Sequence, residues 1–261
     1  MIIPLITVDE IFRFFLLLVR ISAVILTFPV LNSRVIPSQV KIILIVMLSF
    51  SLYPAIHAHN LLFPNTLIHL GFYILGEMFI GMLVGFTGQI IFTGLQLAGT
   101  LMDNQMGLSM ANTVDPQNGH QITITSNFQY IMGILIFMAV NGHHALIMVM
   151  AESLHSIPLQ QFNISMNVGK LLVILMGKAF VMAIRIAAPV IVTILLTNIA
   201  MGIIARTVPQ MNIFILSFPM NLGIGTLILI LALPYIFWSM RNLFSQMNRD
   251  LFMMIHLIAG G

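Results

Sequence analysis

Two groups of ionisable residues lie inside apolar segments of the sequence, where a charge must be paired or reached by water. The first group is acidic. Glu77 is followed by Gly81, Gly85 and Gly88, all within about 80° of one another on a helix of 3.6 residues per turn. Such a face lets two helix backbones approach closely and turns the carboxylate away from lipid. Two interpretations stay open: ordinary helix packing beside a protonated Glu77, or a face that pairs with a specific partner.

The second group is cationic and lies on one face of a later segment. Lys170, Lys178 and Arg185 also fall within about 80° of one another, over a length of about 22 Å. Three unpaired cations at a bilayer centre would cost up to about 10 kcal/mol, at roughly 2.5–3.5 kcal/mol each. The chain has only seven acidic residues, so we expect Lys178 and Arg185 to meet acids of neighbouring subunits. For Lys170, a solvated helix end is the simpler alternative.

A third region is polar and nearly uncharged. Residues 94–127 are rich in Gly, Asn, Gln, Thr and Ser, and Asp103 and Asp115 are their only formal charges. A connection of this length inside a compact assembly is uncommon and is usually functional or disordered. In an apolar chain, a polar insert of this kind is a candidate gate.

Catalytic and metal-binding motifs are absent from the sequence. It contains no HExxH, GxSxG or GxxxxGK[ST] motif, and no GxGxxG between a strand and a helix. His143 and His144 are adjacent, so on a helix they point about 100° apart and cannot chelate one metal; a helix end or turn begun by Asn141 and Gly142 is favoured. The absence of Cys excludes thiolate chemistry. We expect no catalytic residue, metal site or cofactor.

The composition places all these residues in lipid or inside a large assembly. The chain is 59% hydrophobic and only 7% charged, whereas ordinary globular domains carry roughly 25% charge. Its net charge of +3 comes from scattered Lys and Arg without a basic run, which argues against nucleic acid. The 21 Met residues suit either core filling or an adaptable seal around varied polypeptides.

The elements that must position these residues are helices, because backbone amides in lipid have to be satisfied within their own segment. Their lengths fit a span of about 20 residues poorly, and the longest contains Pro189, which should kink or split it. The apolar segments run over residues 11–31, 42–56, 67–93, 128–151, 168–204 and 213–240.

Residues 205–225 carry the most specific pattern, ARTVPQMNIFILSFPMNLGIG. Pro209 and the amides Gln210 and Asn212 follow Arg206 and interrupt two apolar segments. The pattern predicts the tip of a helical hairpin.

With its surroundings, this pattern resembles the FliR family of bacterial flagellar export proteins and its virulence-associated type III secretion counterpart, over essentially the whole chain. One difference is that Met220 and Asn221 follow Pro219, where FliQ-like tips commonly carry a Lys. The motifs that carry the resemblance are LVR at 18–20, FP at 28–29, GE at 76–77, GxxxGF at 81–86, QLAG at 96–99, Asp103, Gln105, Gly107, DP at 115–116, NGHH at 141–144, Ala188 with Pro189, Asn198, Arg206, PQMNIF at 209–214 and FP at 218–219.

The resemblance implies an all-α membrane protein whose helical hairpins look like a fusion of FliP-like and FliQ-like folds, packed in a helical export-gate assembly. Residues 1–165 would form the FliP-like part, including the polar loop 94–127, and residues 166–261 the FliQ-like hairpin with its tip near 205–221. The implied function is a non-enzymatic subunit of the type III protein export gate, which forms and closes the pore for unfolded flagellar or injectisome substrates. The alternative is a stand-alone secondary transporter for a small solute or proton, built on Glu77 and the break at Pro189.

The resemblance also implies partners, a location and roles for particular residues. The partners would be FliP-like and FliQ-like subunits, FlhB-like and FlhA-like export proteins and the unfolded secreted proteins. The location would be the bacterial inner membrane, partly raised out of the bilayer plane, in the flagellar basal body or injectisome base. The loop 106–121 matches a pore plug, with gating residues Met106, Gly107, Leu108, Ser109, Met110, Asp115, Pro116, Gln117, Asn118 and Gly119. Residues predicted to serve subunit packing or charge pairing are Glu77, Gly81, Gly85, Gly88, Lys178, Arg185, Arg206, Gln210 and Asn212.

Overall fold

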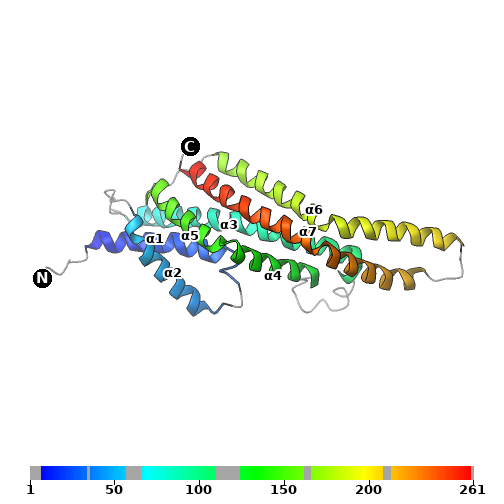
Figure 1. Cartoon of the computed structure of the whole chain (residues 1–261). Helices are drawn as coiled ribbons and strands as arrows, with labels where there is room; N and C mark the ends of the chain where they lie inside the picture. Colours follow the sequence, from blue (N-terminus) through cyan, green and yellow to red (C-terminus); the bar gives the residue numbers. More distant parts are fainter. Residues whose placement is uncertain are drawn as a thin grey trace. The chain divides into compact units, whose positions relative to one another are not determined.

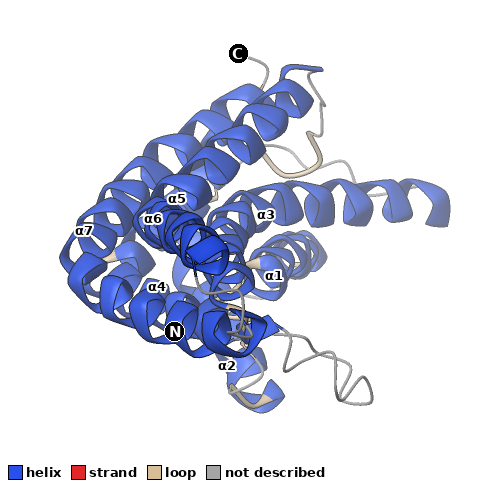
Figure 2. Ribbon diagram, turned by 90° about the vertical axis from the view of Figure 1, so that its right-hand side faces the viewer, coloured by secondary structure: helices blue, strands red, loops and turns tan. Residues whose placement is uncertain are grey.

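The structure, a computed structural model, describes residues 7–33, 36–56, 66–109, 124–161, 166–207 and 213–259. Every regular element in these ranges is helical (Figure 2). In chain order (Figure 1) they are α1 (Val8–Thr27), α2 (Ser38–Leu52), the 3-10 helix η1 (Tyr53–Ala55), α3 (Leu67–Met106), α4 (Ile124–Ala139), α5 (Gly142–Ser156), α6 (Met166–Thr207) and α7 (Ile213–Ile258).

Four of these helices are long and apolar enough to cross a membrane, judged by length and composition over the described residues. They cover Ser38–Ala55, Leu67–Met106, Asn167–Thr207 and Ile215–Ile258. Helices α4 and α5 meet at 70° and would count as a fifth span if they cross together. The predicted all-α membrane fold is confirmed at this level. Its likeness to a FliP–FliQ fusion stays a prediction.

The polar stretch 94–127 is not the single connection that the sequence predicted. Helix α3 continues to Met106 and α4 begins at Ile124, so both ends of the stretch are helical. The reason is burial: Leu95, Ala98 and Met102 recur at helical spacing and are fully buried, which extends the apolar face of α3 into polar sequence. The candidate loop is shortened accordingly.

Two prolines lie inside helices where the sequence predicted an interruption. Pro189 lies inside α6, so the predicted split is absent, and the alternative of a kink stays a prediction. Pro219 lies inside α7, so residues 205–207 and 213–221 of the predicted hairpin tip 205–221 are helical. The break between α4 and α5 agrees with the sequence, because Asn141 adopts the left-handed conformation (φ 57°) directly before α5, which Asn tolerates better than most residues.

The chain divides into two compact units. Unit 1 contains Met1–Ile90, Asn141–Leu175 and Ser245–Gly261, and unit 2 contains Ile91–Val140 and Met176–Phe244. Each unit takes residues from both sides of the predicted boundary at residue 165. That boundary is therefore not the division between these units, and its meaning as a FliP-like to FliQ-like junction stays a prediction.

Each unit has its own buried core. In unit 1, the face of α1 that includes Leu16, Leu17 and Ile21 is buried. In unit 2, the rings of Phe92, Phe137 and Phe244 pack against one another with centroids 5.3–6.1 Å apart. Tilted and edge-to-face arrangements of this kind add to the stabilisation from burial alone.

Candidate functional site

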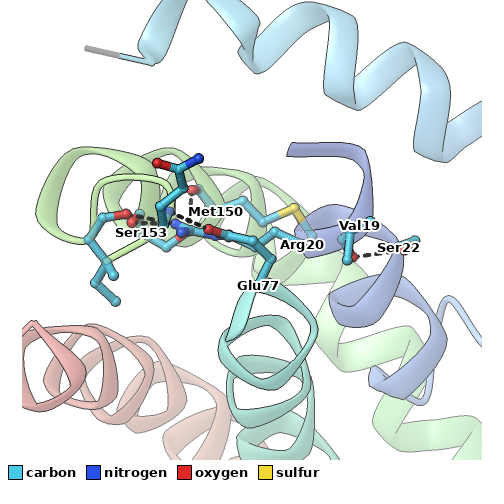
Figure 3. A network of polar contacts seen from close by, with 8 residues as sticks. Val19, Arg20, Ser22, Glu77, Met150 and Ser153 are labelled. Atoms are coloured by element: carbon cyan, nitrogen blue, oxygen red, sulfur yellow. Dashed lines mark hydrogen bonds and ion pairs between the residues drawn. The ribbon is translucent and has the colours of Figure 1, made fainter. Parts of the chain in front are cut away.

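Glu77 forms a buried ion pair with Arg20 inside unit 1. Arg20 Nε lies 2.5 Å from Glu77 Oε2, and each side chain is 2% exposed. Figure 3 shows the two side chains meeting, with Arg20 extending from α1 and Glu77 from α3. The other carboxylate oxygen, Oε1, accepts a hydrogen bond of 3.0 Å from the backbone N–H of Gln160. Both oxygens of Glu77 are therefore used, and the guanidinium contact is a charge-assisted hydrogen bond.

Arg20 also holds the C-terminal end of α5. Its Nη1 donates to the carbonyl oxygens of Ser153 at 2.8 Å and Ile157 at 3.0 Å. The last carbonyls of a helix lack partners within the helix, and a cation near them interacts favourably with the helix dipole. Arg20 consequently ties three elements of unit 1 together: α1, α3 and the end of α5.

No role was predicted for Arg20 beyond its place in the LVR motif. A signal was nevertheless present, because Arg20 interrupts the apolar run of residues 14–30. A cation in such a position needs a partner. Its partner Glu77 lies 57 residues away in the sequence. Helical periodicity predicts only which residues share a face of one helix, so it could not identify this partner.

The glycines that follow Glu77 pack against α1 of the same chain. A Cβ added at Gly81 would meet the carbonyl oxygen of Arg20, and one added at Gly85 would lie 2.9 Å from the carbonyl oxygen of Val24. Gly88 faces a phenylalanine ring at the end of α1. The close approach that these glycines allow is thus made within the chain, and their pairing with a neighbouring subunit stays a prediction.

The cations predicted to pair with other subunits lie at the surface of the chain. Lys170, Lys178, Arg185 and Arg206 are all exposed residues of α6. Gln210 and Asn212, which were predicted to share their role, lie outside the described residues. Surface positions leave the cations accessible to partners, and the acids that would meet them stay a prediction.

The predicted plug begins where α3 ends. Met106 is the last residue of α3 and is 1% exposed. Gly107 follows with φ of +80°, the left-handed conformation in which glycine commonly terminates a helix. Leu108 and Ser109 are half-buried. Met110, Asp115, Pro116, Gln117, Asn118 and Gly119 lie outside the described residues.

Asp103 joins the end of α3 to the start of α4. Its carboxylate is fully buried and accepts hydrogen bonds from the backbone N–H and the hydroxyl of Thr125, at 2.9 and 2.5 Å. A longer contact of 3.4 Å comes from the N–H of Ser126. These backbone donors belong to the first turn of α4, where they lack partners within the helix. Asp103 therefore supplies, from another helix, the N-terminal cap of α4, with a charge that suits the helix dipole.

The backbones of α3 and α4 are in close contact beside this cap. A Cβ added at Gly99 would meet the backbone of Ser126. The sequence predicted neither this contact nor the carboxylate cap, although Asp103 and Gly99 both belong to the motifs that carry the family resemblance. The two described ends of the candidate loop are thus joined at one place in unit 2.

Comparison with known proteins identifies the class to which the chain belongs. Residues 11–247 match the family described as bacterial export proteins, family 1, and the chain belongs to that family. The match spans the ion pair, the glycine face and the Asp103 cap. As a member of a family of export proteins, the chain is not an enzyme.

The relatives that the chain resembles include flagellar proteins. The flagellar biosynthetic protein FliR of Bacillus subtilis (strain 168) is 31% identical over 237 residues, covering 89% of this chain and 90% of that protein. FliR of Escherichia coli (strain K12) is 30% identical, covering 88% and 87% of the two chains. FliR of Pectobacterium carotovorum subsp. carotovorum is 32% identical, covering 92% and 91%.

Proposed function

We propose that this chain is a subunit of a flagellar type III export gate, in which it helps to form and to close the pore for unfolded protein substrates. Its family and the names of its relatives support the export role and favour a flagellum over an injectisome. The observation that carries the gating role is the junction at Asp103. Both ends of the candidate plug meet there, so this junction holds the base of the segment that is proposed to close the pore.

The proposed partners are FliP-like and FliQ-like subunits, with FlhB-like and FlhA-like export proteins beside them in the bacterial inner membrane. Large apolar side chains are exposed along α6 and α7, including Leu195, Leu196, Ile230 and Leu231. Lipid or partner helices would cover them. The exposed cations of the same α6 favour partners over lipid, because a charge facing lipid is costly.

Two observations argue against the alternative of a stand-alone transporter. Glu77, the carboxylate that would bind a solute or proton, already has both oxygens occupied by Arg20 and Gln160. Pro189, which was expected to break a helix at the binding site, lies within a continuous α6. A transporter needs broken helices and accessible polar groups near the bilayer centre.

Replacing residues 110–121 with a Gly/Ser linker of equal length is expected to leave the complex assembled and to make it leaky. The linker keeps Met106–Ser109 and α4, so the junction persists, while the side chains proposed to fill the pore are lost. Ion conductance across the membrane should rise several-fold at unchanged complex yield. The matched control replaces residues 57–64, between η1 and α3, with a Gly/Ser linker of their own length and should conduct as the wild type does.

Two outcomes would contradict this gating role. An assembled deletion complex that stays closed would show that another element closes the pore. Loss of the complex without a leak would show that the loop braces neighbouring subunits.

Expression of the chain alone is expected to yield little monodisperse protein, and co-expression with FliP-like and FliQ-like partners should restore a defined complex. The physical reason is Arg185, which is exposed in the span of α6 and would cost about 2.5–3.5 kcal/mol at a bilayer centre. Size-exclusion profiles in mild detergent measure the effect. Arg185→Leu should improve the chain made alone and weaken its assembly. A well-behaved wild-type monomer would contradict the dependence on partners.

A further inference from the structure

The junction at the ends of the candidate loop contains a second anchor besides the Asp103 cap. Met106 lies one helical turn after Asp103 on α3, and its side chain fills a hole on α7. A Cβ added at Gly225 would lie 2.5 Å from Met106 Cγ and 2.7 Å from its Sδ, with Ile194 Cδ1 of α6 at 3.1 Å. The thioether of Met106 therefore sits where only a glycine leaves room, between the two helices of the hairpin.

Gly107 makes a further contact with the same helix. A Cβ at Gly107 would lie 3.1 Å from Cδ2 of Phe218, and its φ of +80° disfavours any other residue there. Phe218 and Gly225 are seven residues apart on α7, about two turns, and so share one face. The end of α3 is thus held along one face of α7.

The hydrogen bonds of Asp103 form only when α3 and α4 keep their positions relative to each other. The side chain is fully buried, and among the described residues its hydrogen-bond donors are Thr125 and Ser126. A shift of α4 relative to α3 would remove these donors together and leave a buried carboxylate without them. Because an unsatisfied buried polar group is costly, the anchor is either formed completely or released.

We propose that Asp103, Met106 and Gly107 form a latch, which holds both ends of the loop and couples them to the α6–α7 hairpin. Displacement of α7 withdraws the hole that Met106 fills, shifts the last turn of α3 and breaks the Asp103 cap one turn away. Asp103 and Met106 are positioning residues in this latch, since they act through the loop. The proposal rests on the gating role proposed above.

The absence of Cys allows a direct test with a single reporter cysteine in the full chain, Asn118→Cys, assembled with its export partners. The rate of labelling by a membrane-impermeant maleimide reports release of the loop, and complex yield reports assembly. Asp103→Ala should raise the rate several-fold, and Asp103→Asn should raise it less, because the amide oxygen still accepts from Thr125. Asn104→Ala, an exposed neighbour on α3, should label as the wild type does.

The contact of the latch with α7 can be tested with a control variant two residues away on the same helix. Gly225→Ala should displace Met106 and raise labelling, whereas Gly223→Ala should not, because nothing lies within 4 Å of a Cβ at Gly223. Should Gly225→Ala fail to assemble, Met106→Ala tests the same contact by leaving the hole empty.

Each outcome bears on the latch. Unchanged labelling in assembled Asp103→Ala complexes would overturn it. Release by Asp103 variants without release by Gly225→Ala or Met106→Ala would overturn the coupling to the hairpin. The gating role is tested separately, by the ion conductance of the Gly/Ser linker variant. If that variant stayed closed while the labelling rates changed as expected, the gating role would be refuted and the latch would stand.

Discussion

Glu77→Ala is expected to prevent the chain from accumulating in a folded form. The substitution leaves the guanidinium of Arg20 buried without its carboxylate, which is 2.5 Å away in the structure. Removing one member of a buried pair costs about 3–5 kcal/mol, because an uncompensated charge remains inside. That is a large part of the about 5–15 kcal/mol by which proteins are stable. The fraction of the chain, co-expressed with its FliP-like and FliQ-like partners, that stays monodisperse in detergent after heating measures the loss.

Two comparisons distinguish the effect of breaking the ion pair from the effect of removing a carboxylate in general. Glu152→Ala removes another partly buried carboxylate, whose hydrogen bond is to Ser156 one turn away, and should change stability by less than about 1 kcal/mol. The double variant Arg20→Met with Glu77→Leu removes both charges. It should be more stable than Glu77→Ala, because apolar replacements of a buried pair are often neutral. Equal instability of Glu77→Ala and Glu152→Ala would contradict this account.

Gly81→Leu and Gly85→Leu are expected to destabilise the chain by about 3 kcal/mol or more, beyond the usual about 1–3 kcal/mol for overpacking. The obstacles include backbone atoms, namely the carbonyl oxygen of Arg20 opposite Gly81 and that of Val24 opposite Gly85, besides the Thr27 side chain, which lies nearest to a Cβ at Gly85. A flexible side chain could move aside, but these carbonyls can yield only if α1 and α3 separate. Separation would also pull apart Arg20 and Glu77. Thermal unfolding of the co-expressed complex measures the effect.

Gly71 provides the matched control on the same helix, since nothing lies within 4 Å of a Cβ there. Gly71→Ala should stabilise α3 by up to about 1 kcal/mol through helix propensity, whereas Gly81→Ala should destabilise it because the added methyl meets α1. The two alanine substitutions thus have opposite expected signs. If Gly81→Ala were as stable as Gly71→Ala, α1 and α3 would not be in the contact described.

Local patterns in the sequence determined those features that depend on neighbouring residues along the chain. The helical spacing of Glu77, Gly81 and Gly85 predicts one face whatever the fold, because 3.6 residues per turn is a property of the backbone. The same holds for the membrane class, which follows from composition, and for the turn at Asn141. The family resemblance rested on motif order, which is likewise readable without coordinates.

Tertiary structure decided which residues those faces meet. Residues 94–106 look like a loop by composition, yet they are helical because their buried side recurs at helical spacing and packs inside unit 2. Local propensity is weak, about 0–1 kcal/mol per residue, and burial overrides it.

Pairing between distant residues is the part that sequence periodicity could not supply. Arg20 meets Glu77 across 57 residues, and Asp103 caps a helix that begins about 20 residues later. Helical spacing fixes the direction of a side chain on its own helix, whereas the identity of its partner depends on how the helices cross. For this chain, the sequence determined the acidic and small face of α3, and only the packing of α1 and α5 against it decided that Glu77 is a structural anion paired with Arg20.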